Sequence, residues 1–223
     1  MKTILTAVLT ILATYAWGEE FLLKTENNQY RLDISSFCEP TLGSAIDISI
    51  IEHREAMIRT GTKPNLLHLP DCKFASVSDW SSIPVNQTIP MLWIRQSEEK
   101  IPPNFSDRQL MDGLEKFLQE SIGEIINSDE VKSKISNLNK ETGLEQEIVN
   151  AFVIYDNRFP TMASINTSVV EGITRSEFVL LVYIAHDREL IQLYTSFALA
   201  QYNSRYSDAL KMLNKIALSI SNG

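Results

Sequence analysis

Apolar residues in the last third of the chain are spaced as they are in β-strands. The segment Phe178–Ala185 is almost continuously apolar, which is typical of a strand buried on both faces. After the short polar link His186–Glu189, the segment Leu190–Phe197 alternates apolar and polar side chains, with the period of two that a strand requires. Ile148–Tyr155 and Thr161–Val170 are also rich in strand-favouring residues. Because parallel strands need a long crossover and these links are short, the pattern predicts an antiparallel meander.

Apolar residues elsewhere recur with the helical period. Ser106 followed by Gln109 forms a capping box, and the apolar stripe after it predicts a helix over Asp107–Asn127. A second helix is expected from Asp129 to a C-cap near Gly143. A third is expected over 204–221. Its apolar stripe consists of Tyr206, Leu210, Leu213, Ala217 and Ile220.

The first part of the chain is predicted to consist of strands and loops. Two short strands are expected at Phe21–Leu23 and Tyr30–Ile34. The alternation of isoleucine with Asp and Ser over 46–50 favours a half-buried strand. Three prolines between residues 63 and 84 indicate an irregular connection. A further strand is predicted at Thr88–Arg95. One face of that strand carries Met91, Trp93 and Arg95.

The elements together predict an α+β fold in which amphipathic helices cover a central antiparallel sheet. The order of elements in the last third, FVLLVYIA, HDRE, LIQLYTSF and SDALKMLNKIALSIS, resembles the PsbP-like and DcrB-like α/β/α sandwich superfamily. That resemblance implies a non-catalytic accessory or partner-binding protein with no shared catalytic motif. We expect residues 19–223 to form a single α+β domain.

The first eighteen residues predict export from the cytoplasm. Lys2 is followed by the apolar run Ile4–Trp17, which is short for a membrane span. Small residues at Ala16 and Gly18 suit a signal peptidase. We therefore expect residues 1–18 to be a signal peptide and the mature protein to be periplasmic or secreted.

Composition narrows the classes of partner. The chain has 223 residues, 44% of them hydrophobic, and a formal net charge of −8. An acidic protein of this kind is a poor match for nucleic acid, which binds basic surfaces. After the leader, no apolar segment approaches the length of a spanning helix. A protein partner is expected, and the oligomeric state is left open.

The two cysteines, Cys38 and Cys72, are predicted to form a disulfide because the chain is expected to reach an oxidising compartment. Such a bridge would stabilise the fold by roughly 3–4 kcal/mol. The alternatives are a reactive Cys72 thiol near His68 and Asp71, or two buried unpaired thiols.

No residue pattern points to catalysis, a metal or a cofactor. The three histidines, His53, His68 and His186, lack metal-site spacing. Gly43-Ser44 lacks the second glycine of a nucleophile elbow. Paired carboxylates such as Asp129-Glu130 lie at helix starts, where they stabilise the helix dipole. We therefore expect no catalytic residues, no metal and no cofactor.

Aromatic residues are the candidate interface. Trp80 and Trp93 lie in or beside a proline-containing segment, and exposed aromatic residues are common interface anchors. Tyr194, Tyr202 and Arg205, together with Tyr206, are expected to cluster at the junction of the last strand and helix. Packing in the core is the alternative for both groups.

Three Asn-x-Ser/Thr triplets, at Asn86, Asn104 and Asn166, could be glycosylated in a eukaryotic secreted protein.

The sequence favours an exported, non-enzymatic accessory or partner-binding protein, for example an immunity or inhibitor protein. Two alternatives are a small exported hydrolase, with a histidine close to Ser, Cys or Asp, and a carrier of an apolar ligand, with a large cavity between sheet and helix.

Overall fold

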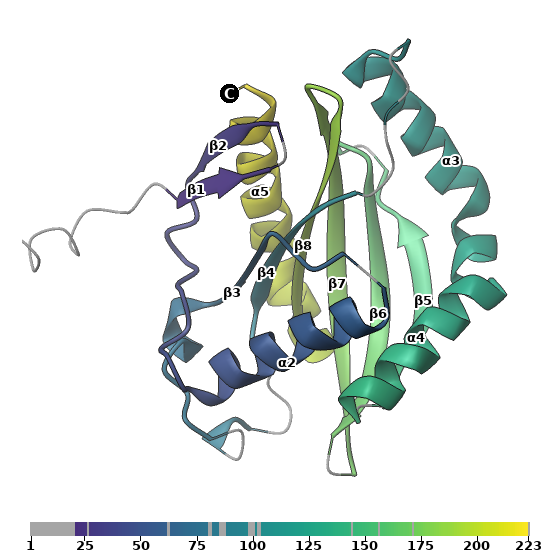
Figure 1. Ribbon diagram of the computed structural model, residues 1–223. Helices are drawn as coiled ribbons and strands as arrows, with labels where there is room; N and C mark the ends of the chain where they lie inside the picture. The colour runs from purple at the N-terminus through teal and green to yellow at the C-terminus, as the bar shows by residue number, and fades with distance from the viewer. Residues whose placement is uncertain are drawn as a thin grey trace, which may run out of the picture.

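A six-stranded antiparallel sheet with helices on both faces forms the body of the protein (Figure 1). The computed structural model describes residues 21–25, 27–61, 63–79, 82–84, 88–97, 101, 104–143, 145–155, 157–170 and 172–222. The predicted signal peptide lies outside the described residues. Among the residues that are described, no helix has the length and apolarity that crossing a bilayer requires.

The strands of the sheet lie in the order β3-β4-β8-β7-β6-β5, and each pairs antiparallel with its neighbours. The strands are β3 (Leu67–Pro70), β4 (Met91–Gln96), β5 (Glu145–Val153), β6 (Thr161–Val170), β7 (Ile173–His186) and β8 (Glu189–Ala198). The predicted α+β class and the meander of the last four strands are confirmed. Two further strands, β1 (Phe21–Lys24) and β2 (Gln29–Leu32), form a separate hairpin.

The helices are α2 (Ala45–Arg59), α3 (Asp107–Asn127), α4 (Asp129–Thr142) and α5 (Tyr202–Ser221). The boundaries of α3 and α4 agree with the predicted ones. Ser106 caps α3 with a complete capping box, and Gly143 ends α4 in the left-handed conformation at φ 69°. These helices were predictable because their end signals are local in the sequence.

The expectation of a strand at 46–50 is wrong, because this segment is the first turn and a half of α2. The Ser44 hydroxyl accepts a hydrogen bond from the Asp47 amide at 3.1 Å, and Asp47 accepts one from the Gly43 amide. These contacts satisfy amides that a helix start leaves free. Ile46 and Ile50 then fall on one helical face and pack into a small apolar cluster.

One face of the sheet carries the main hydrophobic core. Alternate residues of β7 and β8 point to this face, among them Leu180, Val182 and Leu193. The face is covered by α5, through the predicted stripe that ends in Leu213, Ala217 and Ile220, and by the β1–β2 hairpin. Fully burying each such leucine or isoleucine contributes about 1.5–3 kcal/mol.

The opposite face of the sheet lies under α2, α3 and α4 (Figure 1). Helix α3 contacts β5 and β7, whereas α2 and α4 contact each other. The Met111 sulfur of α3 accepts a hydrogen bond from the Ala185 amide, which places α3 over the end of β7. Each face is therefore covered by its own set of helices.

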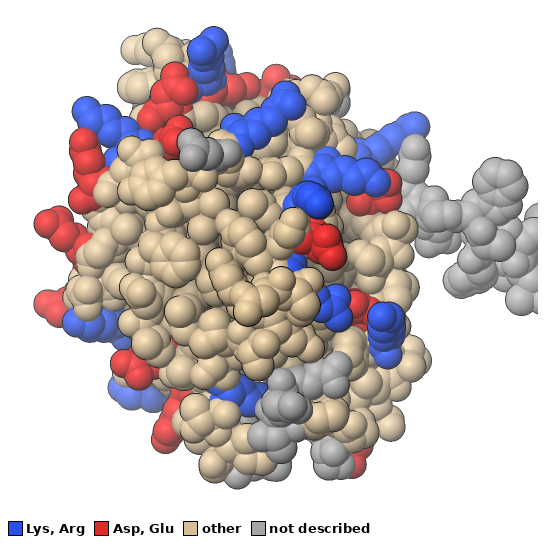
Figure 2. Space-filling model, turned by 180° about the vertical axis from the view of Figure 1, so that it is seen from behind, with Lys and Arg blue, Asp and Glu red and all other residues tan. Residues whose placement is uncertain are grey.

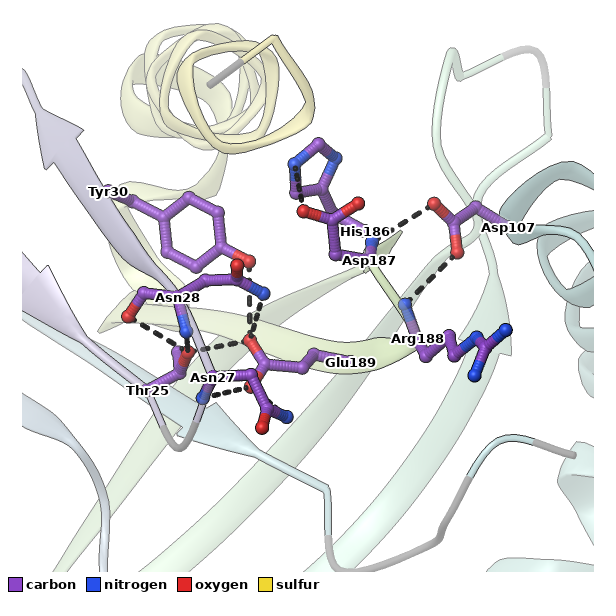
Figure 3. Close-up of polar contacts among 9 residues, drawn as sticks. All are labelled: Thr25, Asn27, Asn28, Tyr30, Asp107, His186, Asp187, Arg188 and Glu189. Atoms are coloured by element: carbon purple, nitrogen blue, oxygen red, sulfur yellow. Dashed lines mark hydrogen bonds and ion pairs between the residues drawn. The ribbon is translucent and has the colours of Figure 1, made fainter. Parts of the chain in front are cut away.

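A two-residue turn sets the register of β7 and β8. Asp187 and Arg188 have φ values of 47° and 66°, and His186 pairs with Glu189 across them. Both values are positive, as in the type I′ turn that suits a hairpin. The amides of Asp187 and Arg188 donate hydrogen bonds to the carboxylate of Asp107, the first residue of α3 (Figure 3). Helix α3 thus holds the turn from one side.

The Glu189 carboxylate holds the other side of this turn to the β1–β2 hairpin. Glu189 is 3% exposed, and its oxygens accept hydrogen bonds from the residues around them (Figure 3). The donors are Thr25 Oγ1 at 2.6 Å, the Asn27 amide and Nδ2, Asn28 Nδ2, the Tyr30 hydroxyl and Gln96 Nε2. Burial alone would raise the pKa of Glu189, but these hydrogen bonds outweigh it and lower the pKa.

Cys38 and Cys72 are joined by a disulfide, with Cα atoms 4.8 Å apart, so the predicted pairing is confirmed. The bridge connects the segment after β2 to the short 3-10 helix Cys72–Phe74 that follows β3. Backbone hydrogen bonds from Cys38 to Pro70 and from Cys72 to Ser36 run alongside it. The chain that leads into α2 is therefore fastened to the edge of the sheet.

Replacing Glu189 should test whether its carboxylate fastens the hairpin. In Glu189→Gln one carboxylate oxygen becomes an NH2 group, which cannot accept the hydrogen bonds that the surrounding donors offer. We therefore expect the free energy of unfolding at pH 7 to fall by roughly 1.5–3 kcal/mol. Because the folded pKa is lowered, this advantage of the wild type exists above the unfolded pKa of about 4.3 and is lost as the pH falls through the folded pKa. Urea unfolding at pH 7 and pH 3 measures both. The exposed Glu124→Gln on α3 is the matched control, and equal stability of both variants at pH 7 would contradict the assignment.

The disulfide should stabilise the fold by restricting the conformations of the unfolded chain. We expect the double variant Cys38→Ser, Cys72→Ser to lose roughly 3–4 kcal/mol of unfolding free energy, because the loop it closes is no longer restrained. Denaturant unfolding of the wild type with and without reductant should give the same difference. A reductant-sensitive transition in the double variant would show that another effect is responsible.

Candidate functional site

A cavity of about 940 Å³ lies between the sheet and helices α2 and α4. Its floor is the sheet face opposite to the main core, and its walls come from α2, α4 and β3. This volume is at the upper end of the range of about 300–1,000 Å³ that small-molecule sites occupy. A space of this size can hold a small molecule.

The middle of the floor is apolar or carries small side chains. Leu181 of β7 lies between Tyr194 of β8 and Met162 of β6. In the next row of the sheet, Val179 lies between two small residues, Ser196 and Ser164. All of these residues line the cavity. The small side chains leave room above the sheet, and the apolar ones make that room suitable for an apolar body.

At one end of the floor, Arg95 lies beyond the row that contains Trp93 and Tyr194. Trp93 and Tyr194 are paired across β4 and β8, and the Tyr194 hydroxyl donates a hydrogen bond to Gln192 Oε1 at 2.5 Å. Burial raises the pKa of Tyr194 to about 12, against the opposing effect of the Arg95 charge. Tyr194 is therefore uncharged at neutral pH. Met91, Trp93 and Arg95 line the cavity from the shared face that their alternation predicted.

The other end of the floor carries Arg175 and Glu177 of β7 and Asn166 of β6. Asn166 pairs with Glu177 in the register of the two strands. Burial raises the pKa of Glu177, and the Arg175 charge opposes this rise. Within the described residues, Arg175 Nε and Asn166 Oδ1 are buried without a hydrogen-bond partner. Buried polar atoms are normally satisfied, so these two mark a place where a ligand atom would be stabilised.

A smaller cavity of about 330 Å³ adjoins this end, since Thr88 and Arg175 line both spaces. From Arg175 to Leu181 the floor extends over about 20 Å, at the usual strand rise of about 3.3 Å per residue. The cavity is therefore elongated, with polar groups at its two ends and an apolar stretch between them.

His53 of α2 and His68 of β3 meet in the cavity wall. Their ring centroids are 5.9 Å apart, and the ring of His68 lies 5.3 Å from that of Trp93. Burial lowers the pKa of both, that of His68 to about 3 with a further contribution from His53. Both rings are thus neutral at pH 7. The described residues contain no group of three or more His, Cys, Asp or Glu side chains suited to a metal ion.

The predicted interface residues are divided by the sheet. Trp93 and Tyr194 line the cavity, whereas Tyr202 lies on the other face with its ring 4.9 Å from that of Phe178 and 5.2 Å from that of Tyr206. The expected packing of Tyr202 with Tyr206 is confirmed. The expected place of Tyr194 in that cluster is wrong, because side chains of β8 alternate between faces and Tyr194 points into the cavity. Arg205 is exposed on α5. Trp80 lies outside the described residues.

The remaining candidates have clear positions. Cys72 is in the disulfide, so it carries no thiol. The imidazole of His186 lies 3.5 Å from the Asp187 carboxylate at the β7–β8 turn and 5.7 Å from the Tyr30 ring.

Asn166 lines the cavity with a buried amide oxygen, which is unlike an exposed glycosylation site. Asn104 is exposed, and Asn86 lies outside the described residues.

Seen from behind, the molecule presents a broad area free of Lys, Arg, Asp and Glu, with charged side chains gathered around it (Figure 2). Aromatic rings also gather on the α5 face of the sheet, where Phe152, Phe178 and Tyr206 pack together and Tyr202 is 38% exposed. This is the second surface of interest after the cavity.

Arg175 and Glu177 were not predicted as site residues. The signal in the sequence was their spacing, because Arg175, Glu177, Val179 and Leu181 are alternate residues of one strand. This spacing places two charged and two apolar side chains on the same face. The same kind of alternation places Arg95 on one face of β4 with Met91 and Trp93.

No family model and no curated protein matches the sequence. Among solved structures, the chain is similar to the solution structure of cyanobacterial PsbP (CyanoP) from Synechocystis sp. PCC 6803. The two are 12% identical, the match covers 63% of this chain and 76% of the other, and the TM-score is 0.27. PsbP also gives its name to the superfamily that the sequence resembles. Nothing about ligands, partners or localisation follows from this likeness.

The neutral histidines predict that acid weakens the fold. Because their pKa values are lowered in the folded protein, their contribution is complete above the unfolded value of about 6.5 and is lost as the pH falls from there. For His68 the loss should continue down to about pH 3. In His68→Phe we expect the unfolding free energy to fall less steeply between pH 6.5 and 4, by up to about 1.4 kcal/mol per pH unit. Denaturant unfolding across this range measures the slope, and identical slopes would contradict the lowered pKa.

Proposed function

We propose that this protein is an exported, non-enzymatic binding protein that holds a small amphiphilic molecule in the cavity between the sheet and α2. The observation that carries the proposal is the cavity itself, with an elongated floor that is apolar in the middle and polar at both ends. A cavity in this position is what the sequence-based alternative, a carrier of an apolar ligand, predicts. The predicted leader and the disulfide support export, because disulfides persist in oxidising compartments.

An elongated molecule with an apolar body is the class of ligand that fits best. Apolar surface such as that of Val179 and Leu181 contributes about 25 cal/mol for each Å² that a ligand removes from water. A polar end group would be needed at the Arg175 end, because the buried atoms there lack partners within the described residues. The site therefore favours a molecule with both parts.

The hydrolase alternative finds less support. It requires a histidine in hydrogen-bond reach of a nucleophile within a cleft. In the cavity His53 contacts His68, which in turn contacts Trp93, and the pKa of each histidine is lowered. These contacts suit a packed wall better than a general base.

A protein partner is the second candidate, as the sequence predicted. The observation in its favour is the uncharged area on the back of the molecule (Figure 2), since the centres of protein interfaces are depleted in charge and rich in aromatic residues. The partly exposed Tyr202 matches that composition. A partner at this surface would leave the cavity free, so the two functions are compatible.

Filling the cavity should abolish ligand binding without unfolding the protein. We expect Val179→Trp to reduce binding of the neutral dye N-phenyl-1-naphthylamine at least tenfold, because the indole would occupy the middle of the floor. Fluorescence titration measures the dissociation constant, and circular dichroism checks the fold.

The matched control is Val149→Trp on β5, because Val149 is 57% exposed and does not line the cavity. It should bind the dye as the wild type does. Dye binding that is unchanged in Val179→Trp, or lost equally in both variants, would contradict a site in this cavity.

A further inference from the structure

We propose that the ligand is a long-chain carboxylate whose head group binds Arg175 and whose apolar chain lies over Val179 and Leu181. This inference rests on the proposed function and specifies both the chemistry of the ligand and its direction in the cavity. Three observations carry it: an arginine atom without a partner, a neighbouring donor–acceptor pair, and the apolar path that begins beside them.

Arg175 has the chemistry that a carboxylate requires. Its Nε is buried without a hydrogen-bond partner among the described residues, and its side chain lines both the main and the smaller cavity. The Nε–H lies on the edge of the guanidinium that grips a carboxylate through two parallel hydrogen bonds. A buried arginine donor is costly to leave unsatisfied, so a ligand oxygen at this point would be stabilised.

Glu177 and Asn166 fit beside such a head group. An ionised Glu177 would repel a carboxylate, and burial, opposed by the Arg175 charge, raises the pKa of Glu177. In its protonated form Glu177 donates a hydrogen bond to the head group. Asn166, opposite Glu177 in the sheet, has a buried amide oxygen without a partner in the described residues. The three side chains together offer donors to one carboxylate and an acceptor for a water or a hydroxyl beside it.

The apolar path fixes the direction of the chain. From Arg175 the cavity-facing residues of β7 are Glu177, Val179 and Leu181 in succession, so polarity ends after Glu177. The far end is less suited to the head group, because Arg95 already interacts within the protein and the Tyr194 hydroxyl is committed to Gln192. A chain anchored at Arg175 would therefore run towards Trp93.

The test compares two ligands that differ only in the head group. Isothermal titration calorimetry at pH 7 with sodium dodecanoate and with dodecan-1-ol would be carried out on the wild type, Arg175→Gln, Glu177→Gln and Arg205→Gln. Arg205 is an exposed arginine on α5 and serves as the matched control. Circular dichroism checks that each variant is folded.

We expect the wild type to prefer dodecanoate and Arg175→Gln to lose roughly 10- to 100-fold in affinity for it, the size expected for a charge-assisted hydrogen bond. Binding of dodecan-1-ol should be unchanged in Arg175→Gln. Glu177→Gln should keep its affinity for dodecanoate because glutamine can donate as the protonated acid does. Arg205→Gln should behave as the wild type.

The possible failures are distinguishable. If neither compound binds the wild type, the proposed function itself is wrong for long-chain ligands. If both compounds bind but Arg175→Gln retains its preference for dodecanoate, the cavity is a binding site and the assignment of the head group to Arg175 is wrong. Loss of dodecanoate binding in Glu177→Gln would contradict the neutral donor role of Glu177.

Discussion

The register of β7 against β8 is the constraint on which the structure depends. A shift by one residue would exchange every core residue of these strands for a cavity residue, because side chains alternate between faces. The turn at Asp187 and Arg188 sets this register through two residues with positive φ. Asp107 holds the turn from α3, and Glu189 holds it to the β1–β2 hairpin. The two carboxylates therefore connect the β7–β8 turn to two separate parts of the chain, α3 and the β1–β2 hairpin.

A consequence of this register is that the two faces of the sheet have different tasks. The face under α5 holds the closely packed core, including Leu193 and Leu213, which are fully buried. Because that face supplies most of the apolar burial, the opposite face can carry polar residues such as Arg175 and Glu177 and remain partly unfilled. If the cavity binds a ligand as proposed, stability and binding are separated across one sheet, and a substitution on the cavity floor changes binding without removing core contacts.

Local signals made much of the fold predictable. The capping box at Ser106, the C-cap at Gly143 and the alternation in β8 each depend on neighbours in the sequence, and each gave the correct element. Helix α2 was missed because isoleucines at 46, 48 and 50 match a strand, while Ile46 and Ile50 also match a helix. The place of Arg175 and Glu177 in the cavity could not be predicted, because charged residues on a strand look solvent-facing until the helices that cover that face are known. The meeting of His53 with His68 depends on the same non-local packing.

Our central proposal is that the face of the sheet opposite α5 binds the apolar body of a small molecule. Intermolecular nuclear Overhauser effects between a bound long-chain carboxylate and the methyl groups of the protein test it most directly. We predict contacts from the ligand chain to the methyl groups of Val179, Leu181 and Met162, all of which line the cavity. Contacts confined to side chains on the α5 face, such as Ile165, would contradict the claim.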